Sequence, residues 1–102
     1  MASRPNLQEE LYRILKNRNV YFQPPASVIM KYPCIRFSFG DPSLTYANDR
    51  GYIKINKYEG VIIDYDPDSD IGDRLLEKFS MISFGKPYVA NNLNHFPFTL
   101  YY

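Results

Sequence analysis

The chain has 102 residues, 45% of them apolar, with one cysteine and a formal net charge of +1 at pH 7. This length predicts a single domain over residues 1–102, able to bury roughly two-thirds of its unfolded surface. The neutral charge gives no electrostatic argument for nucleic-acid binding, which usually needs a basic face. No apolar run approaches the roughly 20 residues of a bilayer-spanning helix, and none follows Met1 as in a signal peptide.

Aromatic residues are the unusual part of the composition, with ten tyrosines, seven phenylalanines and no tryptophan. Tyrosine offers a large contact area and a polar tip, so it is enriched at protein interfaces. Tyrosine and phenylalanine also favour strands. The composition therefore predicts a sheet-rich protein with an adhesive surface.

The first predicted element is a helix over residues 6–16. Four apolar residues recur at the spacing of one helix face: Leu7, Leu11, Ile14 and Leu15. Asn6, with Glu9 three residues later, is typical of a capping box.

The next segment predicts extended structure. Consecutive prolines at 24 and 25 exclude a helix and leave residues 20–25 extended. Alternating polarity predicts a half-buried strand over residues 33–39, in which three apolar side chains share one face: Ile35, Phe37 and Phe39.

The middle of the chain predicts a loop followed by a long strand. Residues 44–51 are polar for the most part and contain a turn signal, and loops of this kind often carry function. Residues 52–65 predict a strand that bends or splits near Asn56. Gly60 within it indicates a bulge or the close approach of another backbone.

The last third begins with a second predicted helix. Pro67 ends the long strand, and the helix covers residues 69–79. Its apolar residues recur every four positions: Ile71, Leu75 and Phe79. Residues 81–87 predict a connection in which Phe84 is buried.

Two strands are predicted at the C-terminal end, over residues 88–92 and 95–102. Pro97 cannot donate a ladder hydrogen bond, so the last strand is expected at a sheet edge, at least at that point. The element order α-β-β(-β)-α-β-β predicts the α+β class, a small single domain whose mixed or antiparallel sheet packs against two helices.

The residue types that could carry chemistry occur in patterns that favour structural roles. Cys34 lies between strand residues and is expected to be a buried thiol. His95 has neither a nucleophile nor an orienting group near it in sequence, so we expect it to hydrogen-bond within a polar turn. The sequence contains no phosphate-binding glycine loop and no zinc spacing, and we predict no cofactor and no catalytic residue.

Four alternating aspartates resemble the start of a calcium loop: Asp64, Asp66, Asp68 and Asp70. Such a loop needs glycine at its sixth position and a carboxylate at its twelfth, and neither possible register provides both. The better interpretation is capping of the following helix by Asp68, Ser69 and Asp70. A metal site or a carboxylate pair for acid–base chemistry is the alternative.

Three motifs give the chain a resemblance to a known family. They are K-Y-P-C-I-R at residues 31–36, D-x-D-P-D-S at 64–69, and N-L-N-H at 92–95 with the final Tyr-Tyr. Over residues 31–102 the chain resembles the tail completion or tail terminator proteins of long-tailed bacteriophages. The turn at residues 83–86 departs from the charged turn expected for that family.

The resemblance implies a virion protein, made in the host cytoplasm, whose α+β sandwich assembles into a hexameric ring. The ring would bind the last ring of tail tube protein, end tube polymerisation and face the neck or connector protein. Any contact with DNA in the lumen would be non-specific, and no membrane is involved. A neck or head–tail connector protein is the alternative within the virion, and a small metal-dependent enzyme is the alternative outside it.

Two contact surfaces are expected on this basis. A closed ring needs a head-to-tail interface, which we place at the C-terminal end: Tyr88, Asn91, Asn92, Asn94, His95, Phe98, Leu100, Tyr101 and Tyr102. The 44–51 loop is expected to contact the tube or the neck through Leu44, Tyr46, Asn48, Asp49 and Arg50.

Overall fold

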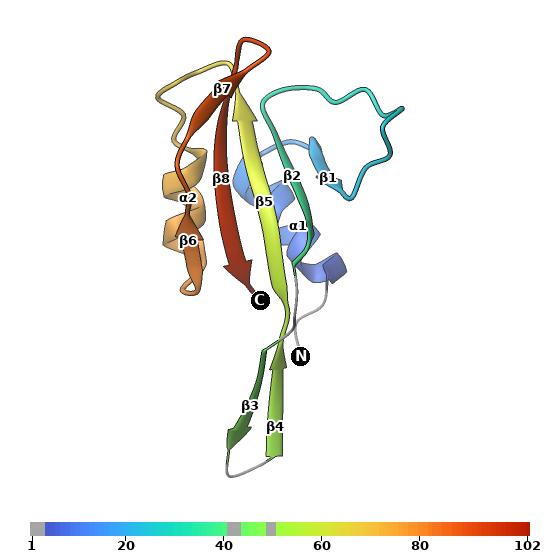
Figure 1. The fold of residues 1–102 in the computed structure, drawn as a ribbon, viewed down its shortest axis with the longest axis vertical. Helices are drawn as coiled ribbons and strands as arrows, with labels where there is room; N and C mark the ends of the chain where they lie inside the picture. The colour runs from blue at the N-terminus through green and yellow to red at the C-terminus, as the bar shows by residue number, and fades with distance from the viewer. Residues whose placement is uncertain (1–3, 41–43, 49–50) are drawn as a thin grey trace.

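The structure, a computed structural model, describes residues 4–40, 44–48 and 51–102, with those from 44 to 55 described by their backbone alone. Two helices, α1 (Arg4–Leu15) and α2 (Ile71–Lys78), pack on one face of a mixed sheet (Figure 1). The six-stranded sheet contains, in spatial order, β1 (Val20–Phe22), β2 (Cys34–Phe39), β5 (Lys57–Asp64), β8 (Leu93–Tyr101) and β6 (Ile82–Phe84), with β7 (Tyr88–Ala90) also paired to β8. The predicted α+β class is confirmed.

The centre of the sheet is antiparallel. β5 pairs with β2 on one side and with β8 on the other, and both pairings are antiparallel. β1 is parallel to β2, which makes the sheet mixed. β1 and β6 therefore form its two edges.

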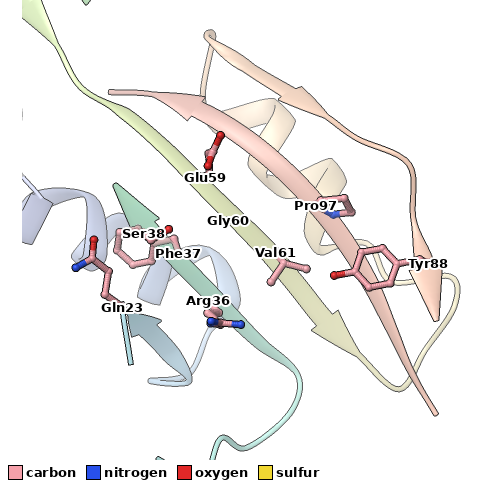
Figure 2. Close-up of a pocket in the computed structure, with 9 residues that line it drawn as sticks. All are labelled: Gln23, Arg36, Phe37, Ser38, Glu59, Gly60, Val61, Tyr88 and Pro97. Carbon is pink, nitrogen blue, oxygen red and sulfur yellow. The ribbon is translucent and has the colours of Figure 1, made fainter. Parts of the chain in front are cut away.

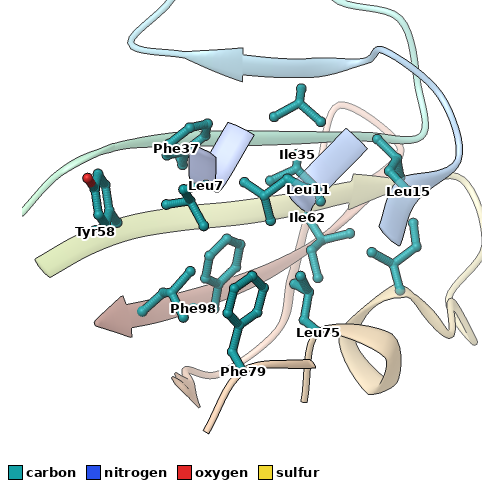
Figure 3. Close-up of a cluster of buried hydrophobic side chains, with 13 residues drawn as sticks. Leu7, Leu11, Leu15, Ile35, Phe37, Tyr58, Ile62, Leu75, Phe79 and Phe98 are labelled. Carbon is teal, nitrogen blue, oxygen red and sulfur yellow. The ribbon is translucent and has the colours of Figure 1, made fainter. Parts of the chain in front are cut away.

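The main core lies between the two helices and the sheet (Figure 3). Leu7, Leu11 and Leu15 of α1 are at most 5% exposed, as their spacing predicts. They meet residues from β2, β5 and β8 together with Ile71 and Leu75 of α2. Burial of such side chains stabilises the domain by roughly 1.5–3 kcal/mol each.

α1 begins at Arg4, two residues before the predicted start, with Pro5 in its first turn. Proline is tolerated there because the first N–H groups of a helix have no partner within it. Asn6 and Glu9 consequently lie inside the helix, and the predicted capping box is wrong. The helix ends where Lys16 turns to a left-handed conformation, with φ at 64°.

α2 begins at Ile71, and its capping differs from the prediction. Asp70 occupies the N-cap position without a side-chain capping bond. Its carboxylate instead accepts a hydrogen bond from Arg74 at 2.9 Å. The Ser69 hydroxyl accepts from the Ile71 N–H at 3.4 Å, so the capping role falls to serine and not to the aspartates.

Arg74 also joins the two helices. Its guanidinium donates a hydrogen bond to the backbone carbonyl of Ile14, in the last turn of α1. The last carbonyls of a helix have no partner within it and carry partial negative charge, so a cation there is favourable.

The predicted 44–51 loop is wrong. β3 (Leu44–Asn48) and β4 (Gly51–Ile55) pair with each other as a separate two-stranded sheet, a hairpin that extends away from the domain (Figure 1). The long predicted strand splits at Asn56 into β4 and β5, as expected. The predicted turn signal starts at Asn48 of β3 and ends at Gly51 of β4, and its two middle residues lie outside the described residues.

β8 as a whole is not an edge strand, because β6 and β7 pair with the side of it that faces away from β5. The edge prediction holds only around Pro97. There the connection between β6 and β7 passes, and the Gly85 N–H donates to the Pro97 carbonyl at 2.9 Å. The missing proline N–H faces this connection, so no ladder bond is lost. Phe84, predicted to be buried, is 41% exposed because β6 is the edge strand.

Gly60 marks the closest approach in the sheet. It lies opposite Phe98 in the continuous β5–β8 ladder, without a bulge. A Cβ at position 60 would be 2.4 Å from the Phe98 ring. The prediction of a bulge or of another backbone at Gly60 is therefore wrong, because the residue is needed to make room for the Phe98 side chain.

We expect Gly60→Ala to lower the free energy of unfolding by about 1–3 kcal/mol, because the new methyl group would displace the buried Phe98 ring. Urea denaturation would measure the change. The matched control is Gly72→Ala in α2, where the new Cβ would meet Phe84 at an ordinary 3.6 Å. The control should be neutral or more stable by up to about 1 kcal/mol. Equal stability of Gly60→Ala and the wild type would contradict the close packing described here.

Candidate assembly surfaces

The sheet face opposite the helices carries a shallow depression of about 270 Å³ (Figure 2). Arg36 lies toward its β2 side, and Tyr88 and Pro97 lie at its β7–β8 side. Glu59, also in the lining, lies 3.8 Å from Lys57 and is largely exposed. The depression is therefore lined by one cation, one carboxylate and a tyrosine, together with uncharged residues.

One end of the same face is covered by the connection between β1 and β2. Cys34, Ile63 and Leu93 form a small second core there, and Met30 and Tyr32 of the connection pack against it. Cys34 is fully buried, as predicted. Burial raises the pKa of its thiol to about 12, and nearby Arg36 opposes this rise.

Two of the predicted interface residues belong to the core of the monomer. Phe98 is 3% exposed and Leu100 is fully buried beneath the helices. Neither side chain can contact another subunit in this structure, so their assignment to a subunit interface is wrong. The alternation of β8 correctly grouped them with Phe96 and Tyr102, but that face packs on this chain's own helices.

The polar residues before β8 serve the local fold. Asn91 and Asn92 both have positive φ, at 53° and 63°, and form a two-residue turn between β7 and β8. This conformation suits a type I′ hairpin turn, which favours asparagine. The Asn94 amide donates to the carbonyls of Asp64 and Tyr65, tying β8 to the end of β5.

Tyr88 and His95 form a stacked pair, with ring centroids 4.8 Å apart. Nδ1 of His95 lies 3.0 Å from the Leu93 carbonyl. His95 thus makes the predicted kind of hydrogen bond, but from within β8 and not from a turn. Tyr88 is 52% exposed, so this pair remains available for contact.

The two terminal tyrosines are both half-buried. Tyr102 packs edge-on against Phe79, with ring centroids 5.9 Å apart. Its backbone also exchanges hydrogen bonds with Asn56. Tyr102 therefore supports the monomer itself, and a truncation there would not isolate an effect on assembly.

The residues expected to contact the tube or neck lie in or beside the hairpin. Leu44, Tyr46 and Asn48 belong to β3, where the structure describes the backbone alone. Asp49 and Arg50 lie outside the described residues. The backbone of β3 and β4 lies at one end of a molecule whose longest dimension is 49 Å.

The aspartates of the β5–α2 connection bind backbone groups. Oδ1 of Asp64 accepts from the Asp66 N–H, and Oδ1 of Asp66 accepts from the Asp68 N–H. Among the described residues, no group of three or more His, Cys, Asp or Glu side chains is placed to hold a metal ion. The aspartates are arranged for a tight turn before the helix.

Two apolar surfaces were not foreseen from the sequence. Ile29, in the connection between β1 and β2, is 89% exposed. On the other side of the sheet, Leu76 and Phe84 border a groove of about 220 Å³ between α2 and the β6–β7 connection. Leu76 carried a usable signal, since it departs from the four-residue spacing of the buried face of α2. Ile29 lies in a stretch without any periodic pattern.

Comparison with protein-family models, curated proteins and solved structures gives no match to this chain. No helix among the described residues is long and apolar enough to cross a membrane.

We expect the Cys34 thiol to react with a disulfide reagent at pH 8 only as fast as the domain unfolds, because the thiol is buried and protonated. The reaction would be followed by the absorbance of the thiolate that the reagent releases. The matched control is the thiol introduced by Ser27→Cys at an exposed position. Equal rates for the two thiols would contradict the burial of Cys34.

The same thiol makes stability depend on pH. Its folded pKa of about 12 lies above the value of about 8.5 for an exposed thiol. The burial of the neutral thiol therefore favours folding below pH ~8.5, and this contribution is lost as the pH rises toward 12. Between pH ~8.5 and pH 12, the free energy of unfolding of Cys34→Ala should therefore fall by less than that of the wild type, as measured by urea denaturation at each pH.

Proposed function

We propose that this chain is a structural protein of a long-tailed bacteriophage virion, a tail completion or terminator protein that caps the tail tube as a homo-oligomeric ring. In that role it ends tube polymerisation and provides the surface that meets the neck. The observation that carries the proposal is the projecting hairpin formed by β3 and β4.

The hairpin is paired only with itself, as a separate sheet beyond the end of β2 and β5. A two-stranded hairpin is at best marginally stable alone in water. Its open edges can pair with strands of another protein by β-augmentation. A projecting hairpin is therefore a suitable element for docking onto the last ring of a tube.

The two ends of the molecule are unlike, which would explain how such a ring stops growth. One end is the hairpin, and the other holds the β7–β8 turn and the β5–α2 connection with its aspartates (Figure 1). Asp64, Asp66 and Asp68 lie in that connection and give it local negative charge. A subunit that binds tube protein through its hairpin exposes its other, unlike end. That end does not bind a further hairpin, so no additional ring can be added.

The three motifs of the family resemblance fall at junctions of the fold. The K-Y-P-C-I-R motif enters β2 through a cis Tyr32–Pro33 peptide bond. The D-x-D-P-D-S motif connects β5 to α2, and the N-L-N-H motif opens β8. These are positions where residue type governs how the chain turns, as expected for structural signatures.

Electron microscopy of particles made with this gene disabled would test the proposal. We expect overlong tail tubes without heads, because nothing would end tube growth. Tails of normal length beside filled heads would instead assign the chain to head–tail joining. Intact, infectious particles would contradict a role in the tail.

We expect replacement of residues 41–55 by a short glycine turn to abolish tail completion while leaving the domain folded, because the hairpin's strands pair only with each other. Unfolding midpoints and particle counts by microscopy would measure both effects. The matched control replaces residues 49 and 50 by Asn-Gly, a pair that favours a two-residue hairpin turn. Normal particles with the shortened chain would exclude the hairpin as the docking element.

A further inference from the structure

We propose that neighbouring subunits of the ring bind by insertion of the 24–30 loop of one copy, led by Ile29, into the α2–β6 groove of the next. The 24–30 loop is the prominent part of the connection between β1 and β2, and the α2–β6 groove is the apolar hollow bordered by Leu76 and Phe84. This inference rests on the proposed ring function and names the partner, a second copy of this chain.

The 24–30 loop presents a single exposed isoleucine on an anchored base. Ile29 is 89% exposed, whereas Val28 is 37% exposed and Met30 packs against the second core. The Val28 N–H donates to the Pro25 carbonyl at 3.1 Å, which closes a turn within the loop. The Lys31 N–H donates to the Tyr21 hydroxyl at 3.0 Å, which holds the end of the loop to β1. A loop ordered in this way loses little conformational freedom on binding.

The α2–β6 groove is apolar and open to a side chain from outside. Leu76 of α2 is 57% exposed and Phe84 of β6 is 41% exposed, and both line the groove. The hollow has a volume of about 220 Å³, and Gly72 and Gly85 are among its lining residues. Apolar surface of this kind on a small protein commonly marks a site of protein contact.

The loop and the groove lie at opposite edges of the sheet. β1, which leads into the loop, is one edge strand, and β6, which borders the groove, is the other. In Figure 1 they occupy the two flanks of the molecule, across its long axis. Different patches on opposite flanks make a heterologous contact, which produces a closed ring when the rotation between copies closes. The hairpin and the aspartate-rich end then remain free for the tube and the neck.

Charge also fits this pairing. Residues 24–30 carry no charged side chain. Lys31 follows them in an exposed position, and Asp73 is exposed at the lining of the groove. Insertion of the loop brings this cation and carboxylate to the same interface with opposite signs. Such a rim pair favours correct orientation.

The test compares the purified wild-type chain with two charge insertions, Ile29→Asp and Leu76→Asp, by light scattering after size exclusion. The wild type is expected to form closed rings, and each variant to be monomeric but still to unfold in one cooperative transition, because both side chains are exposed in the single subunit. Ile29→Met and Leu76→Met, which keep apolar side chains, should retain rings. Glu77→Lys, on α2 but outside the groove lining, should retain them as well.

Mixing the two charge variants distinguishes a head-to-tail contact from a symmetric one. Each variant keeps one intact partner surface, so an equimolar mixture should give a 1:1 dimer and no ring. A mixture that stays monomeric would overturn the proposed pairing, as would rings that persist in either variant.

Covalent cross-linking gives a second measurement that does not depend on destabilising the interface. The double variant Ile29→Cys and Leu76→Cys, treated with a short bismaleimide, should form a ladder of oligomers as each thiol adds to one maleimide. Either single variant should give no ladder, because native Cys34 is buried. A double variant without a ladder would overturn the inference.

Failure of the interface and failure of the function remain separable. A wild-type chain that stays monomeric at its highest soluble concentration, or rings insensitive to both charge insertions, would overturn the interface alone. Electron microscopy of the particles made with the gene disabled tests the tail function independently of the interface. Overlong tubes in that experiment would keep the function while a different interface was sought.

Discussion

β5 pairs with β8 along its whole length, from Lys57 opposite Tyr101 to Asp64 opposite Asn94, and the other elements are arranged around this ladder. The Phe98 ring fits over Gly60 only because that residue has no Cβ. At one end of the ladder the Asn94 amide binds the Asp64 and Tyr65 carbonyls, and at the other Tyr102 and Asn56 exchange backbone hydrogen bonds. The register of β8 is therefore fixed at its middle and at both ends.

This register determines which surfaces the molecule presents. With β8 in the sheet interior, its Phe98 and Leu100 side chains face the helices and complete the core. The edges then fall at β1 and β6, and two of the exposed apolar side chains belong to these flanks: Ile29 in the connection that follows β1, and Phe84 in β6. The hairpin continues past the end of β5, where no helix covers it (Figure 1). The pairing of β5 with β8 thus determines which side chains form the core, which strands form the sheet edges and where the hairpin projects.

Several features could be predicted from the sequence because their causes are local. Helical spacing identified the buried faces of α1 and α2, and alternation identified β2 with its buried Cys34. Gly60 marked a special position in the strand, but the sequence did not show that the Phe98 ring would occupy the space of the missing Cβ. Helix starts were less accurate, since capping depends on which of several nearby polar side chains reaches a free N–H. At α2 the hydroxyl of Ser69 does so, while Asp70 binds Arg74.

The candidate surfaces were predicted less well, for two different reasons. The strand signal of residues 44–48 is short, because Leu44 and Tyr46 alternate with Thr45 but polar residues follow from Asn48 on. Only the pairing with β4 places these two apolar residues opposite Ile55 and Ile53. Phe98 and Leu100 alternate as a buried face must, which the sequence by itself determined. Whether this chain's own helices or another subunit covers that face was decided only by the tertiary structure, because hydrophobic burial is non-directional and any apolar partner satisfies it.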